Sequence, residues 1–347
     1  MDYALFVPMP HAVVNIGQLA ESARGGRDAL ASGSPDPGFL LARDMTVEAD
    51  RAGFYAALIA QRLLGPDLEA WCLAAAIAPF TRQIRMMPAL HPGLWNPVLA
   101  AKMLASLDRI APGRSAVNLV TGWHTREYEM FGGMSHGSEA EKYVEAVEWV
   151  EIIQALHETG RCTYQGQVHT LADGELPMAP AGGPPPIFTA SRSEEGRDMV
   201  ARVGDWWFVP HGRGDYRTSA DDSARAFEET LAMVAGNVLA MTEQAGAHGR
   251  RVRYAVNAFA VVGDTDEDAV QRARQLADLA DKDDERIGAI QISGMTAGLV
   301  GSAETVQARI AAYADVGVEL VLLKLLPAVD ELRSMAEVLG LAPAARG

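Results

Sequence analysis

Residues 189–196 of the chain, Thr-Ala-Ser-Arg-Ser-Glu-Glu-Gly, combine residue types that can bind phosphate. Ser191 and Ser193 flank Arg192, between an apolar run and two glutamates. If a helix begins after Ser193, its free N–H groups, the two hydroxyls and the guanidinium could together hold a dianionic phosphate. The same pattern fits an ordinary serine cap before an acidic first turn. The residues alone support both interpretations about equally.

A second segment, residues 116–133 (AVNLVTGWHTREYEMFGG), concentrates polar and aromatic side chains after an apolar run. His124 and Glu127 are three residues apart, a spacing that can bring two metal ligands together on a helix. No third ligand is in view, and a metal site needs one. We therefore interpret His124 as solvated or hydrogen-bonded, and we expect no metal here.

Short apolar runs alternate with helical patterns along the chain, which is typical of βα units and a parallel sheet. Because buried parallel strands read as continuous apolar stretches, eight runs qualify as strands. They are residues 3–8, 55–60, 84–90, 115–121, 186–190, 206–209, 253–262 and 320–325. Eight βα units in this length favour an α/β fold, a (βα)8 TIM barrel with insertions. A doubly wound sheet is the competing architecture.

In a barrel of this kind the site lies at the carboxyl ends of the strands. The loops that follow the predicted strands there are rich in histidine, tryptophan and arginine. These residues are His11, Arg62, His91, Trp95, Trp123, Arg192, His211 and Arg213. Part of this enrichment is automatic, because loop ends are always more polar than strands.

The pattern predicts one domain, residues 1–347, with insertions near residues 131–185 and 281–301. Within the first we expect a capping box at residues 138–141 and a hairpin that pairs residues 162–164 with 168–170. The second is polar and contains glycine, which makes it a candidate mobile lid. Three further signals mark helix ends: caps at residues 265–268 and 302–304, and a closing Gly317.

A net charge of −15 argues against a nucleic-acid groove or an anionic membrane surface. Any positively charged pocket must therefore be a local concentration of Arg, Lys or His. The two cysteines offer no disulfide framework, and Cys72 is expected to be a buried structural thiol. We find no signal peptide and no membrane-spanning run, so we expect a cytoplasmic protein.

The standard motifs of several enzyme classes are missing from the sequence. It has no Gly-x-Gly-x-x-Gly after a strand, no phosphate loop, no His-Glu-x-x-His and no Gly-x-Ser-x-Gly. Classical NAD binding, nucleotide triphosphate hydrolysis, zinc proteolysis and α/β-hydrolase chemistry lose support accordingly.

The fourth predicted strand resembles that of the luciferase-like flavin monooxygenases, in the branch of the alkanesulfonate, dimethylsulfone and pyrimidine monooxygenases. That branch typically has a Gly-Arg pair, a Val-Asn-hydrophobic-Val-Thr/Ser-Gly-Trp run, and a Glu near a Tyr. Here these stand at residues 113–114, 117–123 and 127–128. Further landmarks match in order at residues 97–102, 107–108, 185–196, 301–304 and 309. The resemblance implies a bacterial luciferase-like barrel and FMN chemistry.

Carried over residue by residue, the resemblance implies a set of flavin contacts. Ala60 and Gln61 would lie beside the isoalloxazine ring, and Asn118 would bond its polar edge. Glu127 would lie at the ring or the ribityl region. The phosphate side would be formed by Lys142, Tyr143, Ser191, Arg192 and Ser193, which raises the phosphate interpretation above the simple cap.

The resemblance also implies a two-component monooxygenase. A separate NAD(P)H:flavin reductase would supply reduced FMN, and O2 would oxygenate a small organosulfur or heterocyclic substrate through a flavin (hydro)peroxide. His91 is our first choice for proton transfer, because imidazole titrates near neutral pH. Arg62 and Arg213 would hold charge, and the pocket would be lined by His11, Trp95, Trp123 and His211. Trp123 fits a core aromatic equally well, and His211 could simply end a strand.

The chain departs from these relatives at His91, where they have an apolar residue or an arginine, and in a shorter second insertion. Both lie where substrate is expected, so the substrate is left open. Two alternatives also stay open: a deazaflavin-dependent oxidoreductase of the same fold, and a non-catalytic flavin-binding protein. A homodimer or homotetramer is implied by the resemblance. The apolar segment 68–77 fits such an interface and a core helix equally well.

Overall fold

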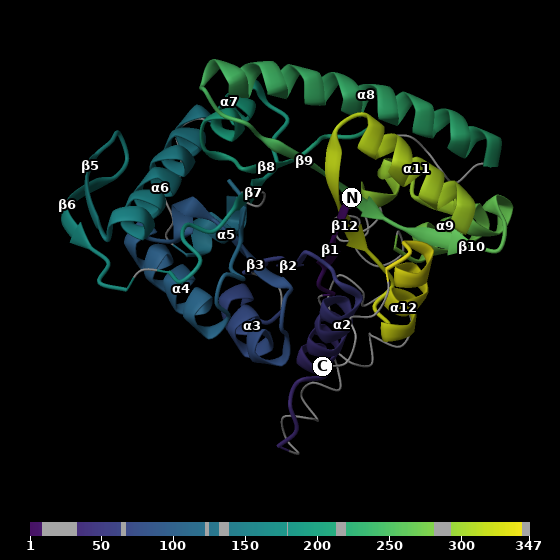
Figure 1. The fold of residues 1–347 in the computed structure, drawn as a ribbon, viewed down its shortest axis with the longest axis horizontal. Coiled ribbons are helices and arrows are strands. Elements are labelled where there is room, and N and C mark those ends of the chain that lie inside the picture. Colours follow the sequence, from purple (N-terminus) through teal and green to yellow (C-terminus); the bar gives the residue numbers. More distant parts are fainter. Residues whose placement is uncertain are drawn as a thin grey trace.

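Eight parallel strands close into a barrel in the computed structural model of the chain (Figure 1). The structure describes residues 1–8, 33–63, 67–121, 125–131, 139–178, 180–212, 220–280 and 293–341. Around the barrel the order is β1-β12-β9-β8-β7-β4-β3-β2. The bounds are β1 (Asp2–Phe6), β2 (Ala56–Ile59), β3 (Arg85–Leu90), β4 (Val117–Leu119), β7 (Ile187–Thr189), β8 (Trp206–Phe208), β9 (Arg253–Phe259) and β12 (Val318–Lys324). The eight predicted strands and the (βα)8 barrel are confirmed, and the doubly wound sheet is excluded.

Alternation along each strand separates the barrel interior from the layer beneath the helices. The inner cluster takes every second residue of the strands: Ala4, Ala56, Leu58, Met87, Ala116, Phe188, Trp206, Phe208, Ala255, Leu320 and Leu322. Phe188 and Trp206 stack inside it with ring centroids 5.0 Å apart. The intervening residues face the helices, which explains why each strand is apolar on both faces.

Helices α2 (Pro37–Ala52), α3 (Ala70–Ile77), α4 (Pro97–Ile110), α6 (Glu139–Thr159), α7 (Glu194–Val203), α8 (Ala220–Ala247), α11 (Ala303–Asp315) and α12 (Val329–Val338) surround the barrel (Figure 1). The starts of α2 and α4 are set by Asp36 and Asn96, whose side chains accept two backbone N–H groups each, with a proline at the first turn. Within the described residues, no helix is long and apolar enough to cross a membrane.

The predicted strand 253–262 is wrong in its length. It breaks after Phe259, where the Ala260 N–H donates to the Lys324 carbonyl and the barrel pairing ends. The chain then leaves the barrel as β10 (Val261–Gly263), which pairs in parallel with β11 (Val300–Ser302) under α9 (Asp266–Ala280). An apolar run cannot reveal such a change of sheet. The predicted caps Thr265 and Ser302 are confirmed, and Gly317 has a φ of 94°.

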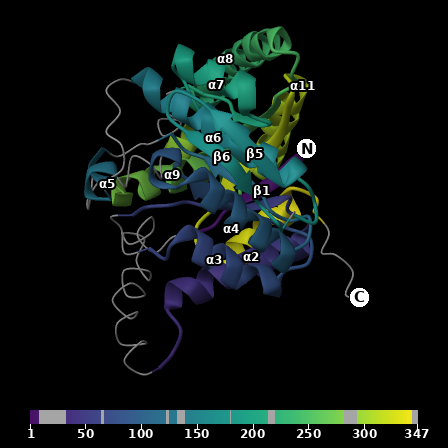
Figure 2. The ribbon, with the colours of Figure 1, turned by 90° about the vertical axis from the view of Figure 1, so that its left-hand side faces the viewer.

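The segment predicted as the first insertion divides into two parts. Helix α6 packs between α4 and α7, as a barrel helix does, and the hairpin β5 (Arg161–Gln165) and β6 (Thr170–Glu175) lies against α6 outside the barrel (Figure 2). The hairpin is confirmed but its predicted register is wrong, because Gln165 pairs with Thr170. The longer turn exists because Glu148 on α6 accepts the N–H groups of residues 167–169.

Cys72 is exposed, so its predicted burial is wrong, whereas Cys162 is buried. Helical spacing places Trp71, Ala74 and Ile77 of α3 in the core and turns Cys72 outward. Segment 68–77 therefore contains a core helix.

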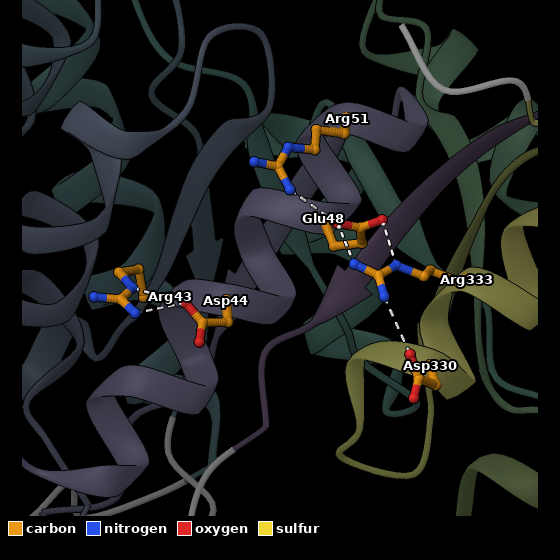
Figure 3. A network of polar contacts seen from close by, with 6 residues as sticks. All are labelled: Arg43, Asp44, Glu48, Arg51, Asp330 and Arg333. Carbon is orange, nitrogen blue, oxygen red and sulfur yellow. Dashed lines mark hydrogen bonds and ion pairs between the residues drawn. The ribbon is translucent and has the colours of Figure 1, made fainter.

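The ring of helices closes where α12 meets α2, the last helix against the first described one. Glu48 on α2 lies between Arg51 of its own helix and Arg333 of α12, and Arg333 also contacts Asp330 (Figure 3). The two arginines lower the pKa of Glu48, mainly through the bond from Arg333. Arg333 is on the surface, where such ion pairs contribute little to stability. The contact between α2 and α12 is therefore stabilised mainly by their buried apolar residues.

Candidate functional site

The carboxyl end of the barrel carries polar side chains at positions that face the interior. His91, Asn118, Asn257 and Lys324 share the strand faces of inner-cluster residues on β3, β4, β9 and β12. The middle of the barrel interior is apolar. Charged groups also lie at its amino end, where Arg85 and Arg253 stack on the rings of Tyr55 and Trp206, but the carboxyl end holds this mixture of imidazole, amides and amine. That end is where the site of a (βα)8 barrel lies.

Three hydroxyl groups meet at the N-terminus of α7. The Tyr143 hydroxyl from α6 lies 3.3 Å from Ser191 Oγ and 3.2 Å from Ser193 Oγ. Ser193 is the predicted N-cap and accepts the Gly196 N–H at 3.2 Å. The cap and the hydroxyl cluster therefore coexist. Lys142 Nζ lies 5.0 Å from the Tyr143 ring centroid, and Arg192 is exposed beside the cluster.

The hydroxyl cluster requires a glycine at position 196, because it leaves no room for a side chain there. A Cβ atom there would lie 1.7 Å from Ser191 Oγ and 2.8 Å from Tyr143 Cζ. Any side chain would push the hydroxyl groups apart. The three hydroxyl groups are thus closely packed beside the N–H groups at the start of α7.

His91 follows β3 and is 1% exposed. Neither ring nitrogen has a standard hydrogen-bond partner among the described residues, and the ring packs edge-on against Tyr128 with centroids 6.2 Å apart. Burial lowers the pKa of His91, while the Glu127 carboxylate and the Gln61 backbone act to raise it. A buried imidazole at the carboxyl end of a barrel strand is suited to exchange a proton with a bound ligand.

Acidic groups lie beyond His91 on α5 (Thr125–Met130) and α6. A Cβ atom on Gly93 would touch both Tyr128 Cε1, at 2.8 Å, and Glu145 Oε2, at 3.2 Å, so these two side chains are neighbours. Burial and the two carboxylates, Glu145 and Glu127, raise the pKa of the Tyr128 phenol. Burial and Glu148 raise the pKa of Glu145 to about 7.

The loop after β2 is held by three polar contacts. Gln61 Oε1 accepts the Ala70 N–H at 2.8 Å, Glu127 Oε1 accepts the Leu63 N–H at 2.8 Å, and Arg62 Nη2 pairs with Asp67 at 2.5 Å. All three predicted site residues thus position this loop. The positive charge of Arg62 is therefore already balanced by Asp67 before a ligand binds.

Basic groups lie on the opposite side of the mouth. His211 Nδ1 bonds the Thr296 hydroxyl at 2.8 Å. Burial, together with the charges of Arg192 and Lys324, lowers the pKa of His211 to about 4, although hydrogen bonds with the backbone of Asn257 and Gly212 act to raise it. Lys324 is 7% exposed, and its Nζ lies 4.9 Å from the Phe6 ring centroid. Burial lowers the pKa of Lys324 to about 8.

Trp95 packs edge-on against Trp71, with ring centroids 6.5 Å apart, and its carbonyl accepts the Trp149 indole N–H. Its own buried indole N–H has no partner among the described residues. Three predicted site residues, His11, Trp123 and Arg213, lie outside the described residues. No group of three or more metal-ligating side chains occurs in the part of the chain that the structure describes.

Sequence reasoning missed Lys324, Asn257, Tyr128 and Thr296 as parts of the mouth. Lys324 had a usable signal: it is a lone lysine in the apolar run Val-Leu-Leu-Lys-Leu-Leu, in register with inward-facing Leu320 and Leu322. Thr296 had none, because it reaches His211 across 85 residues of sequence.

Comparison with known proteins agrees with this architecture. A family model described as luciferase-like monooxygenase matches residues 22–320. The chain is 31% identical over 245 residues to an FMNH2-dependent dimethylsulfone monooxygenase of Pseudomonas fluorescens, and 30% over 235 residues to one of Pseudomonas putida. The matches cover 69% and 65% of this chain but 62% and 59% of those relatives, less than two thirds of their length.

Among solved structures, the monooxygenase RslO1 of Streptomyces bottropensis superposes with a TM-score of 0.70 at 20% identity, over 98% of both chains. At that identity it supports the fold alone. The family model spans most of the barrel, from a point before α2 into the start of β12, and includes His91, Asn118 and Asn257 of the polar mouth. The chain belongs to the luciferase-like monooxygenase family.

Proposed function

We propose that this protein is a two-component monooxygenase, which binds reduced FMN from a separate NAD(P)H:flavin reductase and uses O2 to oxygenate a small organic substrate. The observation that carries the proposal is the pair of complementary features at the barrel mouth. One is the hydroxyl cluster at the start of α7, and the other is a set of buried polar atoms on His91, Trp95 and Asn257 that have no hydrogen-bond partner in the described part of the chain.

The hydroxyl cluster fits the FMN phosphate. Tyr143, Ser191 and Ser193 offer three hydroxyls beside the N–H groups of α7, and Arg192 adds a cation. Ser191 and Tyr143 occupy the space that a side chain at position 196 would need, so the glycine allows the hydroxyl groups to lie close together. A dianion there would interact favourably with the positive end of the helix as well.

The isoalloxazine ring fits the mouth between this cluster and His91. Asn118 faces inward at the end of β4 with an amide that can both donate and accept a hydrogen bond. Ala60 leaves room for a flat ring, while Gln61 and Glu127 fix the loop beside it. Lys142 stands on the phosphate side. When bound, reduced FMN supplies the electrons that activate O2.

The residues of the chain bind, orient and exclude water, and His91 holds or moves one proton. Its Nδ1 and Nε2 atoms are buried at the carboxyl end of β3, where a bound ligand could form a hydrogen bond with one of them. Tyr128 packs against its ring and keeps its own proton across the neutral range, because burial raises its pKa. Trp95, His11, Trp123 and Arg213 complete the proposed pocket wall.

The substrate class proposed from the relatives is an organosulfur compound or a heterocycle. The named relatives are dimethylsulfone monooxygenases, and the matches cover 62% and 59% of their length. We further propose that the protein acts in the cytoplasm and forms a homodimer or homotetramer. The reductase partner follows from the need to supply FMN in its reduced form.

The test combines cofactor binding with oxygen labelling. Anaerobic titration should show tight binding of reduced FMN, and a deazaflavin should bind weakly. With a separate flavin reductase under oxygen-18 gas, a panel of sulfones, sulfonates and heterocycles should yield a product with one labelled oxygen atom. Tight deazaflavin binding with hydride transfer would instead support the oxidoreductase of the same fold. Tight FMN binding without any labelled product across the panel would support a non-catalytic flavin protein.

Matched tyrosine variants separate the phosphate site from general effects. Tyr143→Phe removes only the hydroxyl that joins Ser191 and Ser193. Tyr254→Phe removes a hydroxyl that bonds Thr242 away from the site. Weaker FMN binding in the first variant alone supports the proposed phosphate contact, and equal affinity in both contradicts it.

A further inference from the structure

A buried ammonium group lies inside the barrel mouth, at a place where an amine is costly to keep. Lys324 ends β12 on the same face as Leu320 and Leu322, which belong to the inner cluster. Its Nζ lies over Phe6, which packs against the same cluster from β1. The side chain therefore points into the barrel at its carboxyl end, and only 7% of the residue is exposed.

Desolvation opposes a charge in this position. Burial alone lowers the pKa of Lys324 to about 8, which still leaves the ammonium form dominant at neutral pH. The ring of Phe6 offsets part of the cost of burial through a cation–π contact. The neighbours of Lys324 on the inward face of β12 are Leu320 and Leu322. A buried titratable group with a lowered pKa at the carboxyl end of a barrel strand is a candidate functional residue.

Other groups extend the positive side of the mouth along adjacent strands. Arg192 follows β7 and His211 follows β8, and His211 experiences the charges of both Arg192 and Lys324. On β9, between β8 and β12, Asn257 faces inward with a buried Oδ1 that has no partner among the described residues. Arg192 lies beside the proposed phosphate site, whereas Lys324 lies three strands further round the barrel, beside β1.

We propose that Lys324 is a specificity-determining residue that binds the negatively charged oxygen-acid group of the substrate. The substrate class is therefore a small organic anion, not a neutral molecule such as a dialkyl sulfone. The inference rests on the proposed function, because it assigns the substrate of the same site. The chain carries a net charge of −15, so its overall electrostatic field repels anions. A cation at the barrel mouth would attract an anion locally.

Two probes of nearly equal shape test the charge requirement without turnover. Methanesulfonate and dimethyl sulfone differ by one oxygen anion in place of one methyl group, and acetate adds a planar carboxylate. Calorimetric titration of the full chain, with and without oxidised FMN, should show binding of methanesulfonate or acetate and at least tenfold weaker binding of dimethyl sulfone. Equal affinity for the sulfone and the sulfonate would overturn the proposal, as would failure of both anions to bind.

Variants at Lys324 assign the effect to this residue. Lys324→Met should weaken binding of the anion by about tenfold or more and leave dimethyl sulfone unchanged. Lys324→Arg should retain most of it, and Lys102→Met, at an exposed position of α4, should bind like the wild type. Wild-type anion binding that survives in Lys324→Met would overturn the assignment.

A nuclear magnetic resonance titration of His211 gives a readout that a merely structural role would not move. Because Lys324 and Arg192 lower the pKa of His211, a bound anion should raise it. Anion affinity should also fall as the pH rises through about 8, where the Lys324 amine loses its proton and His211 is already neutral. No response of His211 to the anion would contradict the proposed place of binding.

Failure of this inference and failure of the proposed function are distinguishable. FMN binding without a preference for anions would contradict the proposed role of Lys324 and still support the proposed flavin site. Anion binding without affinity for FMN would support the proposed anion site and contradict the proposed monooxygenase function.

Discussion

The barrel mouth has an acidic side and a basic side, and each holds one histidine. On the acidic side, His91 stands near Glu127 and packs against Tyr128. On the basic side, His211 lies within the field of Arg192 and Lys324. Desolvation is the largest influence on both imidazoles and lowers both pKa values.

The neighbours then decide what each ring can do. Glu127 opposes the desolvation of His91, so a proton on that ring is stabilised by a nearby carboxylate. The cations around His211 reinforce its desolvation, and its pKa of about 4 keeps it neutral above mildly acidic pH. His91 is therefore the ring placed to take up a proton, while His211 is a neutral group held by Thr296.

The largest effect is expected from removing the imidazole on the acidic side. His91→Ala should lower kcat/KM by about 10²–10⁴ with saturating reduced FMN, which is the usual contribution of a positioned acid or base. His211→Asn, which keeps a hydrogen-bonding group, should lower it much less. Single-turnover oxygenation of the identified substrate measures both. Unchanged oxygenation in His91→Ala would remove His91 from the chemistry.

On the basic side, removing the buried ammonium should stabilise the protein. The pKa of Lys324 is lowered from 10.5 to about 8, so the unfolded chain binds more protons between these values and wild-type stability rises with pH across that window. Lys324→Met should abolish this rise and add roughly 3 kcal/mol at most to the free energy of unfolding at pH 7. Urea unfolding at several pH values measures it. A variant less stable than the wild type at pH 7 would contradict the account.

Two glycine variants test where the flavin phosphate belongs on the basic side. Gly196→Ala should weaken FMN binding by tenfold or more, because its Cβ collides with Ser191 Oγ, and overpacking costs about 1–3 kcal/mol. Gly236→Ala, in α8 with nothing within 4 Å, should bind FMN normally and gain up to about 1 kcal/mol of stability. Similar FMN affinities in the two variants would refute the phosphate site.

The smallest effect is expected at Glu145 on the acidic side. Its pKa is raised from 4.5 to about 7, so the folded state holds a proton that the unfolded chain loses, and stability falls as the pH rises through this range. Glu145→Gln should flatten this part of the pH profile by on the order of 1 kcal/mol after allowance for solvent screening. Thermal unfolding between pH 4.5 and 7 checks it, and an identical slope in the variant would count against a buried neutral Glu145.

The strands could be predicted because burial on both faces leaves continuous apolar runs, as at residues 84–90 and 206–209. The break after Phe259 could not, since a strand that changes sheet stays apolar throughout. Cys72 was misplaced because the apolar run around it hides the outward face of α3. The hairpin register depended on Glu148, a contact with a distant helix that local turn residues do not reveal.

For the candidate site, the strand ends allowed the positions of His91, Asn118 and the serines before α7 at the carboxyl end of the barrel to be predicted, while their roles stay predictions. The sequence could not show that Arg62 is paired with Asp67, or that Glu127 and Gln61 hold the neighbouring loop. These contacts depend on side-chain directions within loops. The division of charge across the mouth also lay beyond sequence reasoning, because it joins residues from β3, α5, β8 and β12.

The central claim is that opposite charges on the two sides of the mouth give the two histidines different roles. The most direct measurement is a nuclear magnetic resonance titration of both imidazoles in the wild type, in Glu127→Gln and in Lys324→Met. The account predicts that Glu127→Gln lowers the pKa of His91 alone, and that Lys324→Met raises the pKa of His211 alone from about 4. Equal shifts of both histidines in either variant, or a wild-type His211 that titrates near 6.5, would contradict it.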